Sequence, residues 1–127
     1  HFDIHYLKRP GYGAFDVVLD GTKVTRITTD SPSASLGVHR MDVPDGPHRL
    51  EMISAEQRPV RLFGVALERT APGIIVDSLG IGGSSADALA NADSNVQIES
   101  LHERRYDLVM FLLGSKSFLI VMFCLND

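Results

Sequence analysis

A serine followed by a glycine-rich turn is the segment of this sequence best suited to catalysis or to binding an anion. Residues 77–83 read Asp-Ser-Leu-Gly-Ile-Gly-Gly, and they follow the β-branched run 74–76, which is typical of a strand covered on both faces. Ser84 and Ser85 then offer N-caps for a short helix. A glycine turn between such a strand and a helix presents backbone N–H groups at a sheet edge, where they can hold a phosphate or an oxyanion. The glycine spacing matches neither dinucleotide nor P-loop patterns, so a nucleotide site is not indicated.

A serine nucleophile also needs a general base. Only His48 has an aspartate three residues before it, Asp45, and this pair falls in the predicted Pro-Asp-Gly-Pro turn, so we expect surface or turn roles for all five histidines. Asp77 is expected to brace the glycine turn rather than to join a catalytic triad. The single cysteine, Cys124, excludes an internal disulfide and a multi-thiolate metal site, and we expect neither a metal nor another cofactor. The histidines are His1, His5, His39, His48 and His102.

Aromatic residues near the N-terminus are candidates for stacking on a sugar ring. Tyr6, Tyr12 and Phe15 lie close together in the sequence, and Phe15 is expected in the core. Tyr12 stands between two glycines in a predicted loop, so it is the better ligand-binding candidate. The loops over 10–13 and 29–35 are the surfaces where a glycan would bind.

The first 72 residues are predicted to form β-strands, and these strands position the loops that connect them. Apolar and polar residues alternate from Phe2 onward, and Asp20-Gly21 between two strand-like segments is a strong hairpin signal. Short strands separated by Gly, Pro and Asp turns indicate an antiparallel β-sandwich or jelly roll over 1–72. The strand over 61–68 is predicted to be buried on both faces. Further strands are predicted near 15–19, 23–28, 36–43 and 48–53.

Composition changes at 70–73, where we place a domain boundary between 1–72 and 73–127. The second part predicts a strand over 74–76, a helix over 96–105 with Val96, Leu101 and Ile98 facing inward, and a strand over 107–113. This order predicts a partial α/β unit of the βαβ type, so the fold class is mixed.

Two stretches, 73–83 and 106–114, together look like SGNH (GDSL-type) hydrolases. More narrowly, the chain is similar to members that carry an inserted carbohydrate-binding-module-like jelly roll, as in peptidoglycan O-acetylesterases. Residues 15–21 and 43–50 resemble that inserted sandwich. The resemblance spans nearly the whole chain up to Gly114 and then fades.

The resemblance allows two alignments. In the first, Ser78 is the nucleophile of the Gly-Asp-Ser-Leu block, although Val76 replaces the glycine. In the second, Gly83 belongs to the next block and donates an N–H group to the oxyanion hole. Spacing and the place of the jelly roll favour the second alignment. Lys116 then occupies the position of the family's oxyanion-hole asparagine, and a lysine does not offer the same neutral N–H geometry.

The second alignment puts the nucleophile block before His1 and the Asp-x-x-His block after Asp127. The resemblance therefore implies part of a serine esterase that acts on acyl esters, of polysaccharide in the family members it resembles, and we expect the chain to be inactive alone. The alternative is a non-catalytic carbohydrate-binding module. The strand-like start at Phe2, without a Met, predicts that the chain was cut from a longer protein.

The charge and the hydropathy of the chain limit the classes of partner that it is expected to bind. The net charge of −4 and the lack of a run of Lys or Arg argue against nucleic acid. The apolar stretch 108–125 is interrupted by Lys116, so two short buried segments are predicted rather than a membrane span. The segment 118–125 would need a covering surface, which predicts self-association or a swapped strand. The resemblance implies an exported protein, periplasmic or extracellular.

Overall fold

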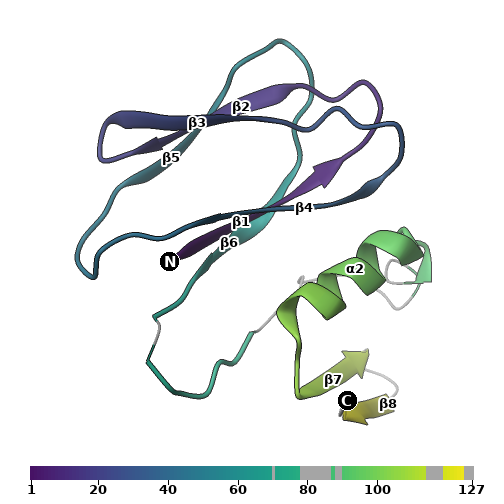
Figure 1. Ribbon diagram of the computed structural model, residues 1–127. Helices are drawn as coiled ribbons and strands as arrows, with labels where there is room; N and C mark the ends of the chain where they lie inside the picture. Colours follow the sequence, from purple (N-terminus) through teal and green to yellow (C-terminus); the bar gives the residue numbers. More distant parts are fainter. Residues whose placement is uncertain (70, 78–86, 88–89, 114–118, 125–127) are drawn as a thin grey trace. The chain divides into compact units, whose positions relative to one another are not determined.

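The computed structural model describes residues 1–69, 71–77, 87, 90–113 and 119–124 (Figure 1). The chain divides into two compact units, which we call unit 1 (His1–Pro72) and unit 2 (Gly73–Asp127).

Unit 1 consists of two three-stranded antiparallel sheets. Their strand orders are β4-β1-β6 and β3-β2-β5, so consecutive strands often lie in different sheets. The prediction of antiparallel β-structure throughout this part of the chain is confirmed. The strands are β1 (Phe2–Lys8), β2 (Ala14–Leu19), β3 (Thr22–Thr28), β4 (Ser35–Met41), β5 (Leu50–Ser54) and β6 (Leu62–Leu67).

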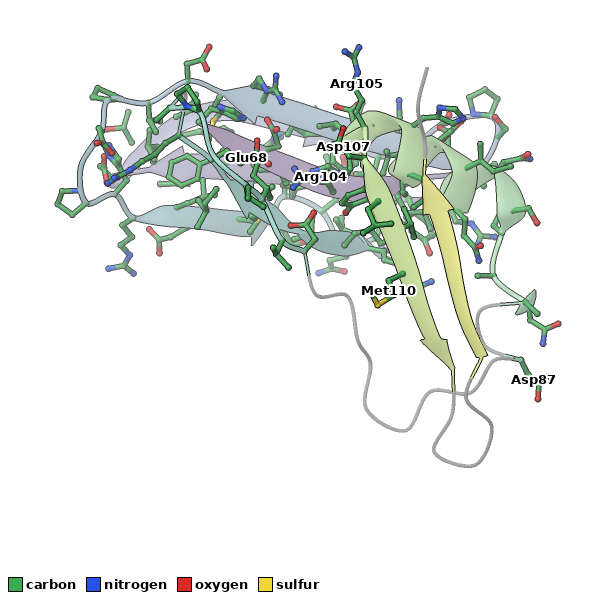
Figure 2. The ribbon with its side chains drawn as sticks, turned by 90° about the horizontal axis from the view of Figure 1, so that it is seen from below. Glu68, Asp87, Arg104, Arg105, Asp107 and Met110 are labelled. Carbon is green, nitrogen blue, oxygen red and sulfur yellow. The ribbon has the colours of Figure 1, made fainter. Side chains whose placement is uncertain are left out.

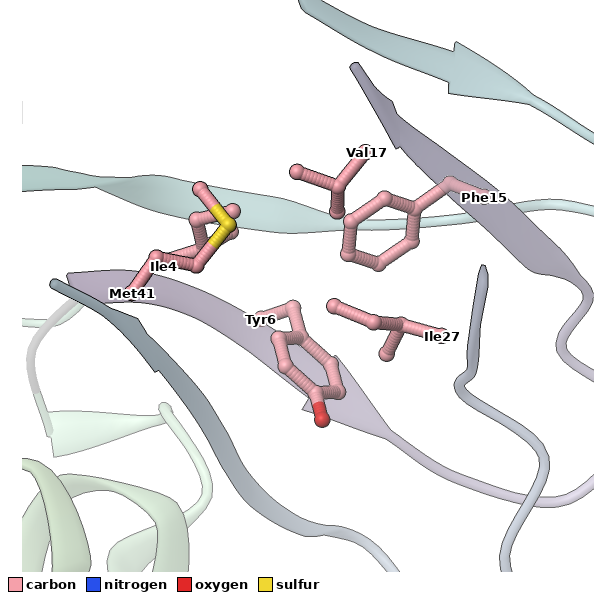
Figure 3. Close-up of a cluster of buried hydrophobic side chains, with 6 residues drawn as sticks. All are labelled: Ile4, Tyr6, Phe15, Val17, Ile27 and Met41. Atoms are coloured by element: carbon pink, nitrogen blue, oxygen red, sulfur yellow. The ribbon is translucent and has the colours of Figure 1, made fainter. Parts of the chain in front are cut away.

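One hydrophobic core is shared by both sheets of unit 1 (Figure 3). Ile4 and Tyr6 are two residues apart on β1, so the alternation of a strand directs both side chains to the same face. Phe15 and Val17 do the same from β2, and the rings of Tyr6 and Phe15 meet edge to face with centroids 5.6 Å apart. Ile27 and Met41 complete the cluster.

The predicted hairpin turn is present between β2 and β3. Asp20 and Gly21 both have positive φ, 51° and 79°, as a tight two-residue hairpin connection requires. Leu19 pairs with Thr22 across the turn. Glycine adopts this backbone without cost, and aspartate tolerates it better than most residues.

The prediction that β6 is buried on both faces was wrong. Leu62, Phe63 and Leu67 are 38%, 48% and 68% exposed. The reason is position: β6 lies at the edge of its sheet and, among the described strands, pairs only with β1. The sequence shows that a strand is apolar but not that it lies at an edge.

Unit 2 contains one described helix and one β-hairpin. Helix α2 (Ser94–Arg104) begins after Asp93, whose Oδ1 accepts hydrogen bonds from the N–H groups of Asn95 and Val96 at 3.0 and 3.2 Å. It ends at Arg105, which has a left-handed φ of 48°. Strands β7 (Leu108–Leu113) and β8 (Leu119–Cys124) pair antiparallel.

Two predictions for unit 2 were wrong, namely the strand over 74–76 and the inward-facing position of Ile98. Residues 74–76 form no strand, and Ile74, Ile75 and Val76 are 94%, 61% and 84% exposed. Among the described strands, β7 therefore pairs with its sequence neighbour β8 and not with a strand at 74–76. Closing a short hairpin costs less chain entropy than a βαβ crossover. Val96 is buried as expected, but Ile98 is 53% exposed.

Candidate functional site

Three loops of unit 1 meet at one end of the two sheets, and we call this the loop end. The antiparallel strand order brings 9–13, 29–34 and 55–61 together. The first two of these contain the loops in which the sequence analysis placed glycan binding. Backbone hydrogen bonds join them: the Arg9 N–H donates to the Thr29 carbonyl at 3.0 Å.

Thr29 fixes the spacing of these loops. It is fully buried, and both its N–H and its Oγ1 hydroxyl donate to the Gly13 carbonyl at 2.8 Å. The Gly13 N–H in turn donates to the Pro59 carbonyl at 3.0 Å. A side chain at Gly13 would collide with Arg58, since a Cβ there would lie 2.9 Å from the Arg58 Cβ. Glycine is therefore required at this position by close packing.

Tyr12 is held between the two glycines of the first loop and is half-buried. The Arg9 guanidinium lies over its ring, 5.4 Å from the centroid, which is the geometry of a cation–π contact. The Gly11 N–H donates to Asp30 Oδ1 at 2.9 Å, so the loop that presents Tyr12 is tied to its neighbour. The loop end thus offers one aromatic ring beside charged groups on a braced backbone.

The other aromatic candidates are not part of this surface. Tyr6 and Phe15 are 8% and 2% exposed and belong to the core. Phe15 was expected there. Of the three aromatic residues considered from the sequence, only Tyr12 lies in a loop where a ligand has access.

A second cluster lies in unit 2 and is centred on Asp77. Its Oδ2 accepts hydrogen bonds from Arg104 Nη2 at 2.8 Å and Nε at 3.0 Å, and from the Tyr106 hydroxyl at 2.7 Å. Burial, and then the hydrogen bond to Asp77, raises the pKa of Tyr106. Figure 2 labels Arg104, the last residue of α2, and also Arg105 and Asp107, which lie between α2 and β7.

This cluster anchors the chain just before the serine and the glycine turn. An aspartate held by a guanidinium and a phenol has its acceptor Oδ2 occupied. The arrangement suits the bracing role expected for Asp77 better than that of a triad carboxylate.

Three of the predicted site residues, Ser78, Gly83 and Lys116, lie outside the described residues, as does the segment around the glycine turn. Their roles stay predictions from the sequence. Tyr12, the fourth predicted site residue, lies at the loop end of unit 1.

Among the histidines of unit 1, His48 is held at both ring nitrogens. His48 Nδ1 lies 2.8 Å from Asp20 Oδ2, and its Nε2 lies 2.8 Å from the Pro44 carbonyl oxygen. Both partners are acceptors, so both ring nitrogens donate in the protonated ring. These contacts raise the pKa of His48, first through Asp20 and then through Pro44. His48 therefore has the structural turn role expected from the sequence.

No group of His, Cys, Asp or Glu among the described residues is arranged to bind a metal ion. None of the described helices has the length and hydrophobicity needed to traverse a bilayer.

The sequence analysis identified Tyr12 but missed its neighbours Arg9, Asp30 and Arg58. Charged loop residues carry no local signal of their own, because loops are generally polar. The Arg-Pro-Gly-Tyr-Gly order of 9–13 was interpreted only as a turn.

No protein family, curated protein or solved structure matches this chain.

Proposed function

We propose that this chain is part of an SGNH (GDSL-type) serine esterase that acts on acyl esters of polysaccharide. In this proposal unit 1 is a carbohydrate-binding β-sandwich of the jelly-roll type, and unit 2 is the SGNH-like segment that carries the oxyanion glycine, Gly83. The protein is exported, and the chain by itself does not turn over esters.

The observation that carries the proposal is the loop end of unit 1. A polysaccharide is recognised by an aromatic ring that packs on the apolar face of a sugar and by adjacent polar groups that bind its hydroxyls. Tyr12 with Arg9 and Asp30 supplies both on a braced backbone. The two-layer arrangement of unit 1 supports a sandwich module in which loops, not strands, contact the ligand.

Unit 2 supports the esterase part of the proposal through Asp77. Its bonds to Arg104 and Tyr106 fix the backbone immediately before the predicted Ser78 and the glycine turn. A fixed approach to an oxyanion loop is what preorganised N–H donors need, because the donors must be in place before charge develops.

The expected lack of turnover by the chain alone agrees with the state of His48, the histidine that has an Asp-x-x-His spacing. Acyl transfer by serine needs a histidine with one nitrogen free to take the proton. His48, which is paired with Asp20 and with the Pro44 carbonyl, has both ring nitrogens occupied.

Binding to polysaccharide tests the function of unit 1. The full chain is passed over a panel of insoluble polysaccharides and peptidoglycan, with Tyr12→Ala and Leu67→Ala compared. Leu67 is exposed at the opposite end of unit 1 and serves as the control. Retention that is lost in Tyr12→Ala and kept in Leu67→Ala supports the proposal. A folded chain that is retained by no polysaccharide contradicts it.

Hydrolysis of p-nitrophenyl acetate separates the esterase segment from the alternative. We expect no acetate release above buffer from this chain. Release that disappears in Ser78→Ala would contradict the inactive state and would favour the alignment in which Ser78 is the nucleophile. Restoration of turnover by adding flanking sequence with Gly-Asp-Ser and Asp-x-x-His blocks would support the esterase lineage over a purely binding module.

A further inference from the structure

We infer that the polysaccharide bound at the loop end of unit 1 is anionic, carrying carboxylate groups. This inference rests on the proposed function of unit 1, and it adds the chemical class of the ligand. It follows from the charges that the fold gathers beside Tyr12.

Cations outnumber carboxylates at the loop end. The loop end, 9–13, 29–34 and 55–61, contains three cations and two carboxylates, and Lys8 at the end of β1 adds a fourth cation beside it, which gives an excess of two positive charges in a chain whose net charge is −4. These residues are far apart in the sequence, so the excess is produced by the strand order. The cations are Lys8, Arg9, Arg58 and Arg61, and the carboxylates are Asp30 and Glu56.

The carboxylates do not neutralise these cations. Asp30 Oδ1 is taken by the Gly11 N–H, and its Oδ2 lies 3.9 Å from Arg58 Nη1. Glu56 Oε2 lies 3.6 Å from Arg58 Nε. Both ion pairs are long, all three side chains are at least 42% exposed, and such pairs contribute little. A ligand carboxylate can therefore compete for Arg58.

Three cations remain for a ligand. Lys8, Arg9 and Arg61 form no ion pair within the part of the chain that the structure describes, and Arg9 and Arg61 are exposed. A guanidinium offers a planar fork of N–H donors that binds both oxygens of a carboxylate. Arg9 is already ordered by the Tyr12 ring, so binding costs it less side-chain entropy.

The opposite end of unit 1 has no excess of cations. Four carboxylates lie there with two guanidinium groups and the N-terminal ammonium, and His48 is engaged by one of the carboxylates. An anionic polymer is therefore attracted to the loop end rather than to that end, which orients its approach. The carboxylates are Asp20, Asp42, Asp45 and Glu68, and the guanidinium groups belong to Arg49 and Arg69.

The experiment compares an acidic with a neutral polysaccharide. The full chain is titrated with polygalacturonate and with hydroxyethylcellulose at 50 and 300 mM salt, and affinity is read from gel retardation. We expect polygalacturonate to bind at least ~10-fold more tightly at low salt, which is about 1.4 kcal/mol. Higher salt should weaken that binding, because exposed charges are screened.

Two matched variants locate the effect. Arg58→Gln with Arg61→Gln removes two charges at the loop end, and Arg49→Gln with Arg69→Gln removes two at the opposite end. The first double variant should lose roughly 10-fold in affinity for polygalacturonate, and the second should stay within about twofold. Circular dichroism and thermal unfolding confirm that both variants are folded.

Each outcome of these titrations either supports or overturns the inference. Equal affinity for the neutral polymer, or equal loss in both double variants, overturns it while leaving the proposed function intact. Absence of binding to either polymer, and to every polysaccharide of the panel, overturns the proposed function as well. Single-stranded DNA binding as tightly as polygalacturonate would also overturn it, because the charge would then act without the sugar.

Discussion

The imidazole of His48 lies 2.8 Å from the carboxylate of Asp20, and this contact joins the β2–β3 turn to the segment between β4 and β5. The Arg49 N–H donates to the other oxygen of Asp20 at 2.8 Å, and His48 Nε2 reaches the Pro44 carbonyl. One aspartate of a hairpin turn therefore holds a connection that is 28 residues away in sequence.

The stability of the chain should depend on pH through this pair. The pKa of His48 is raised above 6.5, so its contribution is complete below 6.5 and is lost as pH rises through the raised value. The pKa of Asp20 is lowered, first by the Arg49 N–H and then by His48, so its contribution is complete above 3.8 and is lost in acid. The pair therefore contributes most to the stability of the folded chain between pH 3.8 and pH 6.5.

Thermal unfolding of the full chain at pH 5.5 and pH 8.5 measures this dependence. We expect the melting temperature to fall by a few degrees at the higher pH, and His48→Gln to reduce that difference. His102→Gln is the control, since His102 is exposed on α2. An unchanged pH dependence in His48→Gln would show that another group is responsible.

The ion pair between Asp3 and Arg40 should be more important than its exposed counterpart on the other sheet. Arg40 donates from Nε and Nη2 to the two oxygens of Asp3 at 2.7 and 2.6 Å, and the Asp3 side chain is only 3% exposed. Arg40→Met leaves a buried carboxylate without its main partner. Because Arg40 itself is 58% exposed, we expect less than the usual loss of about 3–5 kcal/mol for a buried pair, about 2–3 kcal/mol in the free energy of unfolding.

Arg26→Met is the matched control for that variant. Arg26 also donates from Nε and Nη2 to one aspartate, Asp16, but the Asp16 side chain is 17% exposed and keeps Lys23 at 2.8 Å. The loss should be clearly smaller than for Arg40→Met, because this carboxylate is less buried and keeps a second cation. Urea unfolding of both variants gives the comparison, and equal losses would argue against burial as the cause.

The strands of unit 1 could be predicted from the sequence, because the alternation of a strand and the conformation of a turn depend on residues that are neighbours in the chain. The period of two from Phe2 to Tyr6 depends only on strand geometry, and Ile4 and Tyr6 lie in the core as the pattern implies. Asp20-Gly21 forms the hairpin turn because positive φ values are intrinsic to those residue types.

Features that depend on sheet partners were not predictable in the same way. The contact between Gly11 and Asp30 spans 19 residues, and it exists because β3 returns the chain to the end where β1 stops. The exposure of Phe63 follows from the edge position of β6, which no single segment encodes. The run 74–76 has strand composition, but a strand forms only where a partner backbone pairs with it.

Tyr106 should ionise at higher pH than an ordinary tyrosine. Burial raises its pKa above 10.0, and the hydrogen bond to Asp77 raises it further. Asp77→Asn should therefore lower the pKa of Tyr106, which NMR titration of the tyrosine ring resonances measures. A pKa that does not move in Asp77→Asn would show that the hydroxyl does not donate to Asp77.

Removing the Tyr106 hydroxyl should loosen the end of α2. Tyr106→Phe loses one hydrogen bond to a carboxylate, about 1 kcal/mol, and should speed amide exchange in the last turn of α2 and at Tyr106. Tyr12→Phe is the control, because the Tyr12 hydroxyl forms no hydrogen bond among the described residues. Equal acceleration by both changes would contradict a specific role for Asp77.

Two glycines of the same sheet should respond in opposite ways to alanine. Gly37 on β4 pairs with Tyr6 on β1, and the Tyr6 ring lies where a Cβ at Gly37 would be. Tyr6 is 8% exposed and packs edge to face on Phe15, so its ring has little room to move. We expect Gly37→Ala to cost about 1–3 kcal/mol in the free energy of unfolding, as overpacking of a core does.

Gly64 on β6 is the comparison, because a Cβ there would meet no atom within 4 Å and its backbone needs no positive φ. Gly64→Ala should be neutral or slightly stabilising, since alanine restricts the unfolded chain more than glycine does. Urea unfolding of both variants provides the measurement. If Gly37→Ala were as well tolerated as Gly64→Ala, the Tyr6 ring would have to swing away from β4, and the edge-to-face contact with Phe15 would not fix the core.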